Sequence, residues 1–153
     1  MNLEQFIVKA KANGWVGNFK DGKKIAASRK GSFDITYDDV AFHYHDSFVG
    51  FSEFSGQEHD THKNKPVWSM VYYGYLLKPT KFTGDEAVSI LKNALSKMYD
   101  EQRFLGGFHY SEGPYEYRDM NFGDYKRFNG IEKIFMDSEL VYELIYCGGM
   151  VRK

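Results

Sequence analysis

The sequence contains little cysteine and little proline, with one cysteine, Cys147, and three prolines among 153 residues. A single cysteine excludes a disulfide within the chain, and no neighbouring motif marks Cys147 as a nucleophile. No apolar run approaches the ~20 residues that span a bilayer. The N-terminal MNLEQF lacks the basic and apolar regions of a signal peptide. We therefore expect a soluble protein of the reducing cytoplasm with no membrane partner.

An excess of charge of either sign is also missing. The 20 basic and 21 acidic residues give a net charge of −1, whereas nucleic-acid binders usually carry a basic excess or stripe. The mildly basic stretch at residues 20–30 is interrupted by Asp21 and has no interleaved aromatic residues. P-loop, G-x-G-x-x-G and G-x-S-x-G motifs are absent. We expect no nucleic-acid partner and no cofactor.

Aromatic residues, by contrast, are abundant, at 18% of the chain with 12 Tyr and 13 Phe. Large flat side chains pack well on a pleated surface, so this content favours β-sheet. Fifteen glycines favour strands joined by tight turns. The length fits a single domain over residues 1–153, which would bury roughly two thirds of its unfolded surface. No internal repeat is evident.

Two segments have the apolar period of an amphipathic helix. The first covers residues 3–13, and Asn2 with Gln5 predicts a capping box at its start. The second covers residues 84–101, where a wide apolar stripe follows the capping-box sequence TGDE. We expect the second helix to be the central packing element.

The remaining segments alternate between apolar and polar residues or are continuously apolar, and turn residues separate them. Residues 67–77 are apolar on both faces, which predicts a strand in the middle of the sheet that is covered on each side. Asn129-Gly130 reads as a turn between two late strands. The order of one helix, strands, a second helix and more strands predicts an α+β fold. We expect an antiparallel, curved β-sheet of about 7–9 strands packed on the 84–101 helix, with the short helix over 3–13.

The block from Phe42 to Tyr75 joins strand-forming residues with four of the five histidines. His43 and His45 share a strand face, but no carboxylate follows at the spacing that a metal site needs, so we predict no metal site. In the strand at 57–62, Glu58 with a histidine would suit a general base and its orienting partner. A hydrated polar strand is the favoured interpretation of that segment.

Ligand pockets are mainly apolar with a few polar groups, and the strand at 67–77 has this character. Trp68 and Tyr72 lie on one face of that strand and Tyr73 on the other. Glu58 lies on the strand before it. We predict a ligand-binding site at Glu58, Trp68, Tyr72, Tyr73 and His45, and we name no catalytic residue.

The segments FSGQE, KPVWSMVYYGY and RFLGG resemble a bacterial family of small single-domain proteins of unknown function. The resemblance extends from the first helix to the C-terminal YELIYCGGMVRK. Related domains occur behind helix-turn-helix domains in some bacterial regulators, which implies a sensory or partner-binding module. This chain has no helix-turn-helix part, so the resemblance does not imply DNA binding, and no catalytic motif is carried over.

Three hypotheses for function follow. The first is a non-catalytic domain that binds a small molecule or a protein partner in an aromatic-lined cleft. The second is a homo-oligomeric interaction protein, such as a homodimer, because aromatic strands at a sheet edge invite pairing between chains. The third is a small metal-assisted hydrolase that uses Glu58 and histidines from the set His43, His45, His59, His62 and His109. We favour them in that order, and hence a protein that is not an enzyme.

Overall fold

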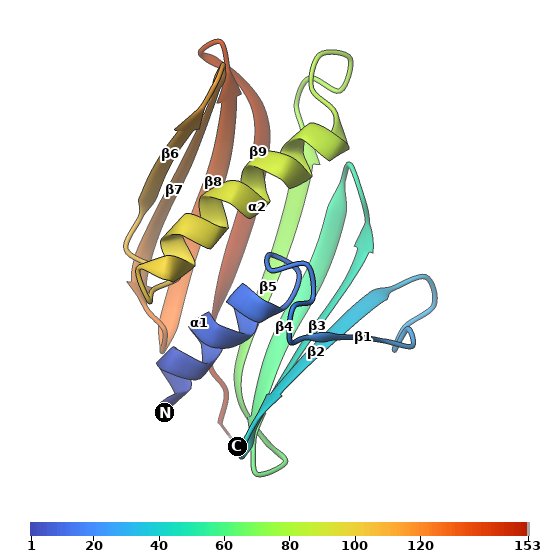
Figure 1. Ribbon diagram of the computed structural model, residues 1–153, viewed down its shortest axis with the longest axis vertical. Helices are drawn as coiled ribbons and strands as arrows, with labels where there is room; N and C mark the ends of the chain where they lie inside the picture. The colour runs from blue at the N-terminus through green and yellow to red at the C-terminus, as the bar shows by residue number, and fades with distance from the viewer. Residues whose placement is uncertain (153) are drawn as a thin grey trace.

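The computed structural model describes residues 1–152. In this part of the chain two helices, α1 (Leu3–Asn13) and α2 (Gly84–Asp100), accompany nine strands. All nine form one open, curved antiparallel sheet in the order β1-β2-β3-β4-β5-β9-β8-β7-β6 (Figure 1). The strands are β1 (Lys23–Ile25), β2 (Phe33–Asp39), β3 (Phe42–Gly50), β4 (Phe54–His62), β5 (Lys65–Leu76), β6 (Phe108–Glu112), β7 (Tyr115–Asp124), β8 (Arg127–Met136) and β9 (Glu139–Met150). The predicted fold class is confirmed.

Both helices begin where the sequence predicts. The Gln5 amide donates to the Asn2 side chain and the Asn2 amide to the Gln5 side chain, each at 2.9 Å. At α2 the Glu86 amide donates to the Thr83 hydroxyl at 3.2 Å, and the Thr83 amide donates to the Glu86 carboxylate at 2.7 Å. These capping boxes satisfy amide groups that the first turn of a helix leaves unpaired. Neither helix of residues 1–152 has the length and apolar character needed to cross a membrane.

The two helices lie on the same face of the sheet, which we call the inner face (Figure 1). The main core lies between this face and α2, and it includes Trp68 from β5 and Ile90 and Leu91 from α2. The opposite, outer face of β5 is open, with Val71 47% and Tyr73 48% exposed. The prediction that residues 67–77 are covered on both sides is therefore wrong. The strand is central, but both helices pack on one side only.

Apart from the short edge strand β1, the order of the strands is symmetric about the junction between β5 and β9. We call α1 with β2–β5 the first half of the fold and α2 with β6–β9 the second half. In each half a helix precedes four consecutive antiparallel strands. At the junction, Tyr72 pairs with Tyr146.

The registers of the two halves match residue for residue, and several equivalent positions hold the same amino acid. These are Tyr44 and Tyr117, Asp46 and Asp119, Gly56 and Gly130, Glu58 and Glu132, Tyr72 and Tyr146, and Gly74 and Gly148. The register shift after Asp60 recurs after Ile134. The chain therefore contains an internal repeat. The sequence shows it only as short, isolated patterns, because few equivalent positions are identical and the two helices differ.

The predicted turn at Asn129-Gly130 is also wrong, because both residues lie inside β8. Gly130 is the counterpart of Gly56 in β4. Each glycine lies opposite a tyrosine of the next strand, so Gly130 is explained by its pairing with Tyr146 of β9 and not by a chain reversal.

Candidate functional site

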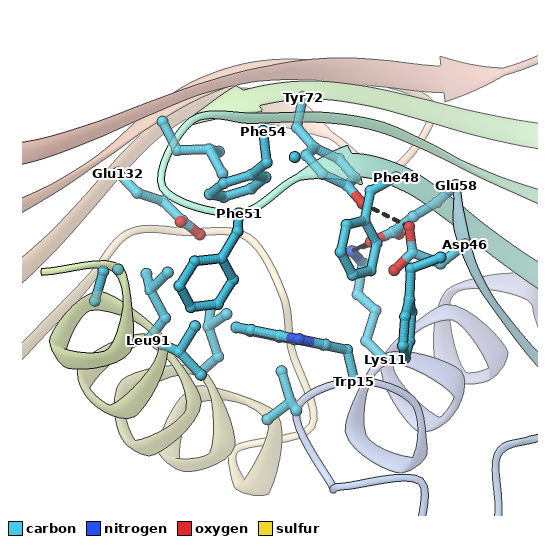
Figure 2. Close-up of a pocket in the computed structure, with 18 of the residues that line it drawn as sticks. Lys11, Trp15, Asp46, Phe48, Phe51, Phe54, Glu58, Tyr72, Leu91 and Glu132 are labelled. Carbon is cyan, nitrogen blue, oxygen red and sulfur yellow. Dashed lines mark hydrogen bonds and ion pairs between the residues drawn. The ribbon is translucent and has the colours of Figure 1, made fainter. Parts of the chain in front are cut away.

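A cavity of about 400 Å³ lies between the inner face and the two helices (Figure 2). Its walls are mainly aromatic and aliphatic. The first half and its loops contribute side chains such as Trp15, Phe48, Phe51 and Phe54, and α2 contributes side chains such as Leu91. Among residues 1–152 the ionisable side chains on its wall, other than tyrosines, are three carboxyl groups and one amine. They are Asp46, Glu58, Glu132 and Lys11.

Lys11 and Glu58 form a buried ion pair in the first half. The Lys11 ammonium lies 2.8 Å from Oε1 and 2.6 Å from Oε2 of Glu58, and both side chains are almost fully buried. The ammonium also contacts the sulfur of Met70 at 3.7 Å. A buried charge is tolerated when a partner of opposite sign lies against it, which explains why α1 places a lysine on its inward face.

Asp46 lies opposite Glu58 on the neighbouring strand and accepts a hydrogen bond of 2.6 Å from the Tyr72 hydroxyl. Tyr72 belongs to β5, so its ring must cross β4 to reach β3. It does so at Gly56, where any Cβ would collide with the end of the ring. The second half repeats this contact, since Tyr146 crosses Gly130 and donates to Asp119 at 2.6 Å.

Glu132 is the counterpart of Glu58 in the second half and is 9% exposed. Figure 2 shows its carboxyl group directed into the cavity, on the opposite side from the group formed by Lys11, Glu58 and Asp46. Within residues 1–152 it forms no ion pair.

Three inner-face carboxyl groups titrate near neutral pH. Burial and the Glu58 carboxylate raise the pKa of Asp46 to about 7, and the same two causes raise the pKa of Asp60 to about 8. Burial and the Asp119 carboxylate raise the pKa of Glu132 to about 8. Asp60 does not line the cavity, and neither of its oxygens has a hydrogen-bond partner in residues 1–152. Groups with such pKa values exchange protons readily at neutral pH and become counter-ions when a cation approaches.

The structure brings two of the five predicted ligand-binding residues to the cavity, Glu58 and Tyr72. Trp68 lies on the same face but is fully buried in the core, where its indole N–H donates to the Tyr125 carbonyl at 2.9 Å. Tyr73 and His45 lie on the outer face, on the other side of the sheet from the cavity.

His45 takes part in a separate polar cluster on the outer face. Its Nε2 lies 2.6 Å from the Asp34 carboxyl group, which also accepts hydrogen bonds of 2.5 Å from Ser28 and Ser32. Although burial opposes ionisation, these hydrogen bonds hold the pKa of Asp34 below its usual value. The cluster ties the loop before β2 to the sheet.

The histidines invoked for a metal-assisted hydrolase do not meet Glu58. His43, His45 and His59 are on the outer face, whereas Glu58 is on the inner face. His62 lies at the end of β4, where it pairs with Phe42 and stacks on the Phe42 ring with the ring centres 4.5 Å apart. His109 interacts with Glu116 at 2.8 Å on a distant strand. Within residues 1–152, no three or more His, Cys, Asp and Glu side chains are placed to hold a metal ion.

Of the four acidic and basic residues on the cavity wall, three were not identified from the sequence, namely Lys11, Asp46 and Glu132. Asp46 and Glu132 had a detectable signal. The pattern Y-x-D occurs at Tyr44–Asp46 and again at residues 117–119, and G-x-E occurs at 56–58 and 130–132. Lys11 also had a signal, because it follows Ile7 by four residues and so continues the apolar face of the helix, whereas Lys9 does not.

Comparison with known proteins gives one match. The model of a family described as Domain of unknown function (DUF5680) matches residues 46–151, from β3 to the end of β9. No curated protein and no solved structure matches the chain. The matched segment includes Asp46, Glu58 and Glu132 but leaves α1, and therefore Lys11, outside. Because it covers more than half of the sequence, the protein belongs to the DUF5680 family.

Proposed function

We propose that this protein is a non-catalytic binding domain that takes a small, largely apolar organic molecule into the cavity between the sheet and the helices. The observation that carries the proposal is the cavity itself, about 400 Å³ in volume and lined mainly by aromatic and aliphatic side chains. Ligand pockets in proteins commonly have about 300–1,000 Å³ and few polar groups. A cytoplasmic sensory module, the role expected from the family resemblance, would use such a cavity.

The polar part of the cavity wall also supports binding because interactions within the protein hold it in place. The Tyr72–Asp46 hydrogen bond and the Lys11–Glu58 ion pair fix the polar part. A preformed site loses less conformational entropy when the ligand enters, which favours affinity.

The neutral fluorescent probe N-phenyl-1-naphthylamine tests this proposal, since its emission rises in an apolar site. We expect it to bind the wild-type protein, and Val88→Phe to weaken binding at least about tenfold by filling the cavity. Val88 lines the cavity. The matched control is Val71→Phe, the same substitution on the open outer face, which should bind as the wild type does. Absence of probe binding, or equal binding by the two variants, would refute the proposal.

The outer face supports a second candidate, a homodimer. Tyr73 is 48% and Ile145 is 53% exposed, and they lie opposite each other on β5 and β9. A second copy would cover this apolar strip at the centre of the sheet. Sedimentation velocity should then show a dimer that Ile145→Lys dissociates, and a monomer at high concentration would remove this candidate.

A further inference from the structure

The internal repeat allows one half of the fold to be used as a guide to the other. In the first half, Glu58 holds a primary ammonium group, that of Lys11, through both of its oxygens. The ammonium lies 6.0 Å from the centre of the Trp68 ring and against the sulfur of Met70. The inner face thus already contains one site that binds an ammonium group, formed by a buried carboxylate, an aromatic ring and a thioether sulfur.

The second half has the same carboxylate in the same position of the sheet but no ammonium. Glu132 corresponds to Glu58, Leu144 to Met70 and Tyr142 to Trp68. The side chains that α2 turns toward the cavity are aliphatic, apart from Tyr99. Glu132 is therefore a nine-tenths buried carboxyl group directed into the cavity without a basic partner in residues 1–152.

We propose that Glu132 binds the ammonium group of an organic amine whose apolar body fills the cavity, in the way that Glu58 binds Lys11. This inference rests on the proposed function and adds the chemical class of the ligand. It also predicts that anionic molecules bind poorly. The one lysine on the cavity wall is already paired with Glu58, whereas two further carboxyl groups, Asp46 and Glu132, face the ligand.

Binding of the amine must be coupled to the loss of a proton from Glu132. Burial and Asp119 raise its pKa to about 8, so the empty site is mostly protonated at pH 7. The charged groups that face Glu132 include Asp119 on β7, Glu58 on β4 and Lys11 on α1. The neighbouring hydroxyl groups are those of Tyr117, Tyr99 and Tyr142. Affinity for an amine should fall about tenfold for each pH unit below 7, because an alkylammonium keeps its charge over that range.

Three probes that share a naphthalene ring distinguish the effect of ligand charge on affinity from the effect of ligand shape. They are 1-naphthylmethylamine, 1-naphthalenemethanol and 1-naphthoate. Isothermal titration calorimetry at pH 7.5 should show the amine binding at least about tenfold more tightly than the alcohol, since a hydrogen bond to a charged group stabilises the complex more than a neutral one does. The naphthoate should bind most weakly of the three.

Glu132→Gln keeps the shape of the side chain but removes its charge. In this variant the affinities for the amine and the alcohol should differ by no more than about twofold, and the affinity for the amine should no longer fall at low pH. Glu143→Gln is the matched control. Glu143 lies on the neighbouring strand and the outer face, where it binds Tyr75, and its substitution should leave the preference for the amine intact.

The possible failures are distinguishable. Equal affinity of wild type for the amine and the alcohol overturns the ammonium site and leaves a neutral binding cavity in place. A preference that Asp46→Asn abolishes and Glu132→Gln does not would also overturn the assignment to Glu132. If none of the three probes binds and N-phenyl-1-naphthylamine does not bind either, the proposed function itself fails.

Discussion

Replacement of Lys11 by methionine should be among the most damaging single changes to the stability of this protein. Methionine preserves most of the volume of the lysine side chain, so the change removes charge rather than packing. It leaves Glu58 buried beside Asp46 and Asp60 without a cation, and removing one partner of a buried ion pair costs roughly 3–5 kcal/mol. We expect a loss of about 3 kcal/mol in the free energy of unfolding at pH 7.5.

The pH dependence of this loss identifies its cause. The Lys11 ammonium favours the charged forms of Asp46 and Asp60, whose pKa values are about 7 and about 8. Below these values the two carboxyl groups take up protons and lose their charge, so the penalty of the missing ammonium shrinks. The difference between wild type and Lys11→Met should therefore be small near pH 5 and largest near pH 8. Urea denaturation followed by tryptophan fluorescence at both pH values measures it.

Lys9→Met is the control on the same helix, since Lys9 pairs with Asp39 at the surface and its side chain is 50% exposed. Surface ion pairs contribute little, so this variant should stay close to wild type at both pH values. Two results would contradict this reasoning: Lys11→Met is no less stable than Lys9→Met, or its loss of stability does not change with pH. Either result would mean that Glu58 does not depend on Lys11 for its charge. The Lys11–Glu58 pair could then not serve as the model for a ligand at Glu132.

Three further predictions concern the inner face. Gly56→Ala and Gly130→Ala should each lower the free energy of unfolding by roughly 2–4 kcal/mol. In each variant the new methyl group displaces a tyrosine ring and breaks the hydrogen bond from that tyrosine to an aspartate. Urea titrations that show a change below about 0.5 kcal/mol would contradict this. Glu132→Gln should match the wild type near pH 4.5 and exceed its stability by roughly 3–5 kcal/mol at pH 9. Folding raises the pKa of Glu132 to about 8, so the wild type loses stability as the pH rises from about 4.5 to about 8. Thermal unfolding as a function of pH checks this, and curves that stay parallel would count against it. Tyr142→Phe should be neutral or stabilise by about 1 kcal/mol, because the Tyr142 hydroxyl is buried with no hydrogen-bond partner among residues 1–152. Tyr72→Phe should destabilise by about as much, because it removes the hydrogen bond to Asp46. Equal effects of the two changes, measured in the same urea experiment, would show that the hydroxyl environments do not differ.

The expected stabilisation by Glu132→Gln bears on function. Binding sites commonly contain residues that lower the stability of the folded protein, because the requirements of activity and stability conflict. A buried carboxyl group that destabilises the fold at neutral and alkaline pH fits this pattern. The same variant is expected to lose the preference for amines. A gain in stability together with a loss of that preference would mark Glu132 as a residue kept for binding.

Local patterns were sufficient for the helices and for the class of the fold. The capping boxes at Asn2 and Thr83 fix where α1 and α2 begin, because they depend on side chains three residues apart. Alternation along the strands also separated Tyr72 from Tyr73 correctly, since successive strand residues point to opposite faces. Which of these faces is covered could not be predicted, because the position of the helices depends on contacts between distant segments.

Gly130 shows why the remaining features required the tertiary structure. In the sequence, Asn129-Gly130 has the composition of a turn, whereas in the fold the glycine makes room for Tyr146 from the next strand. His45 and Glu58 likewise belong to one aromatic block of the sequence but lie on opposite faces of the sheet.

The sequence by itself determined the α+β class, the two helices and the aromatic strands that build the sheet, because short-range periodicity and capping encode them. Only the tertiary structure decided that the two halves repeat one another and that Lys11 meets Glu58. It alone also decided that Glu132 has no ammonium partner among residues 1–152. These relations depend on strand register and on the docking of α1 and α2, which bring together residues far apart along the chain.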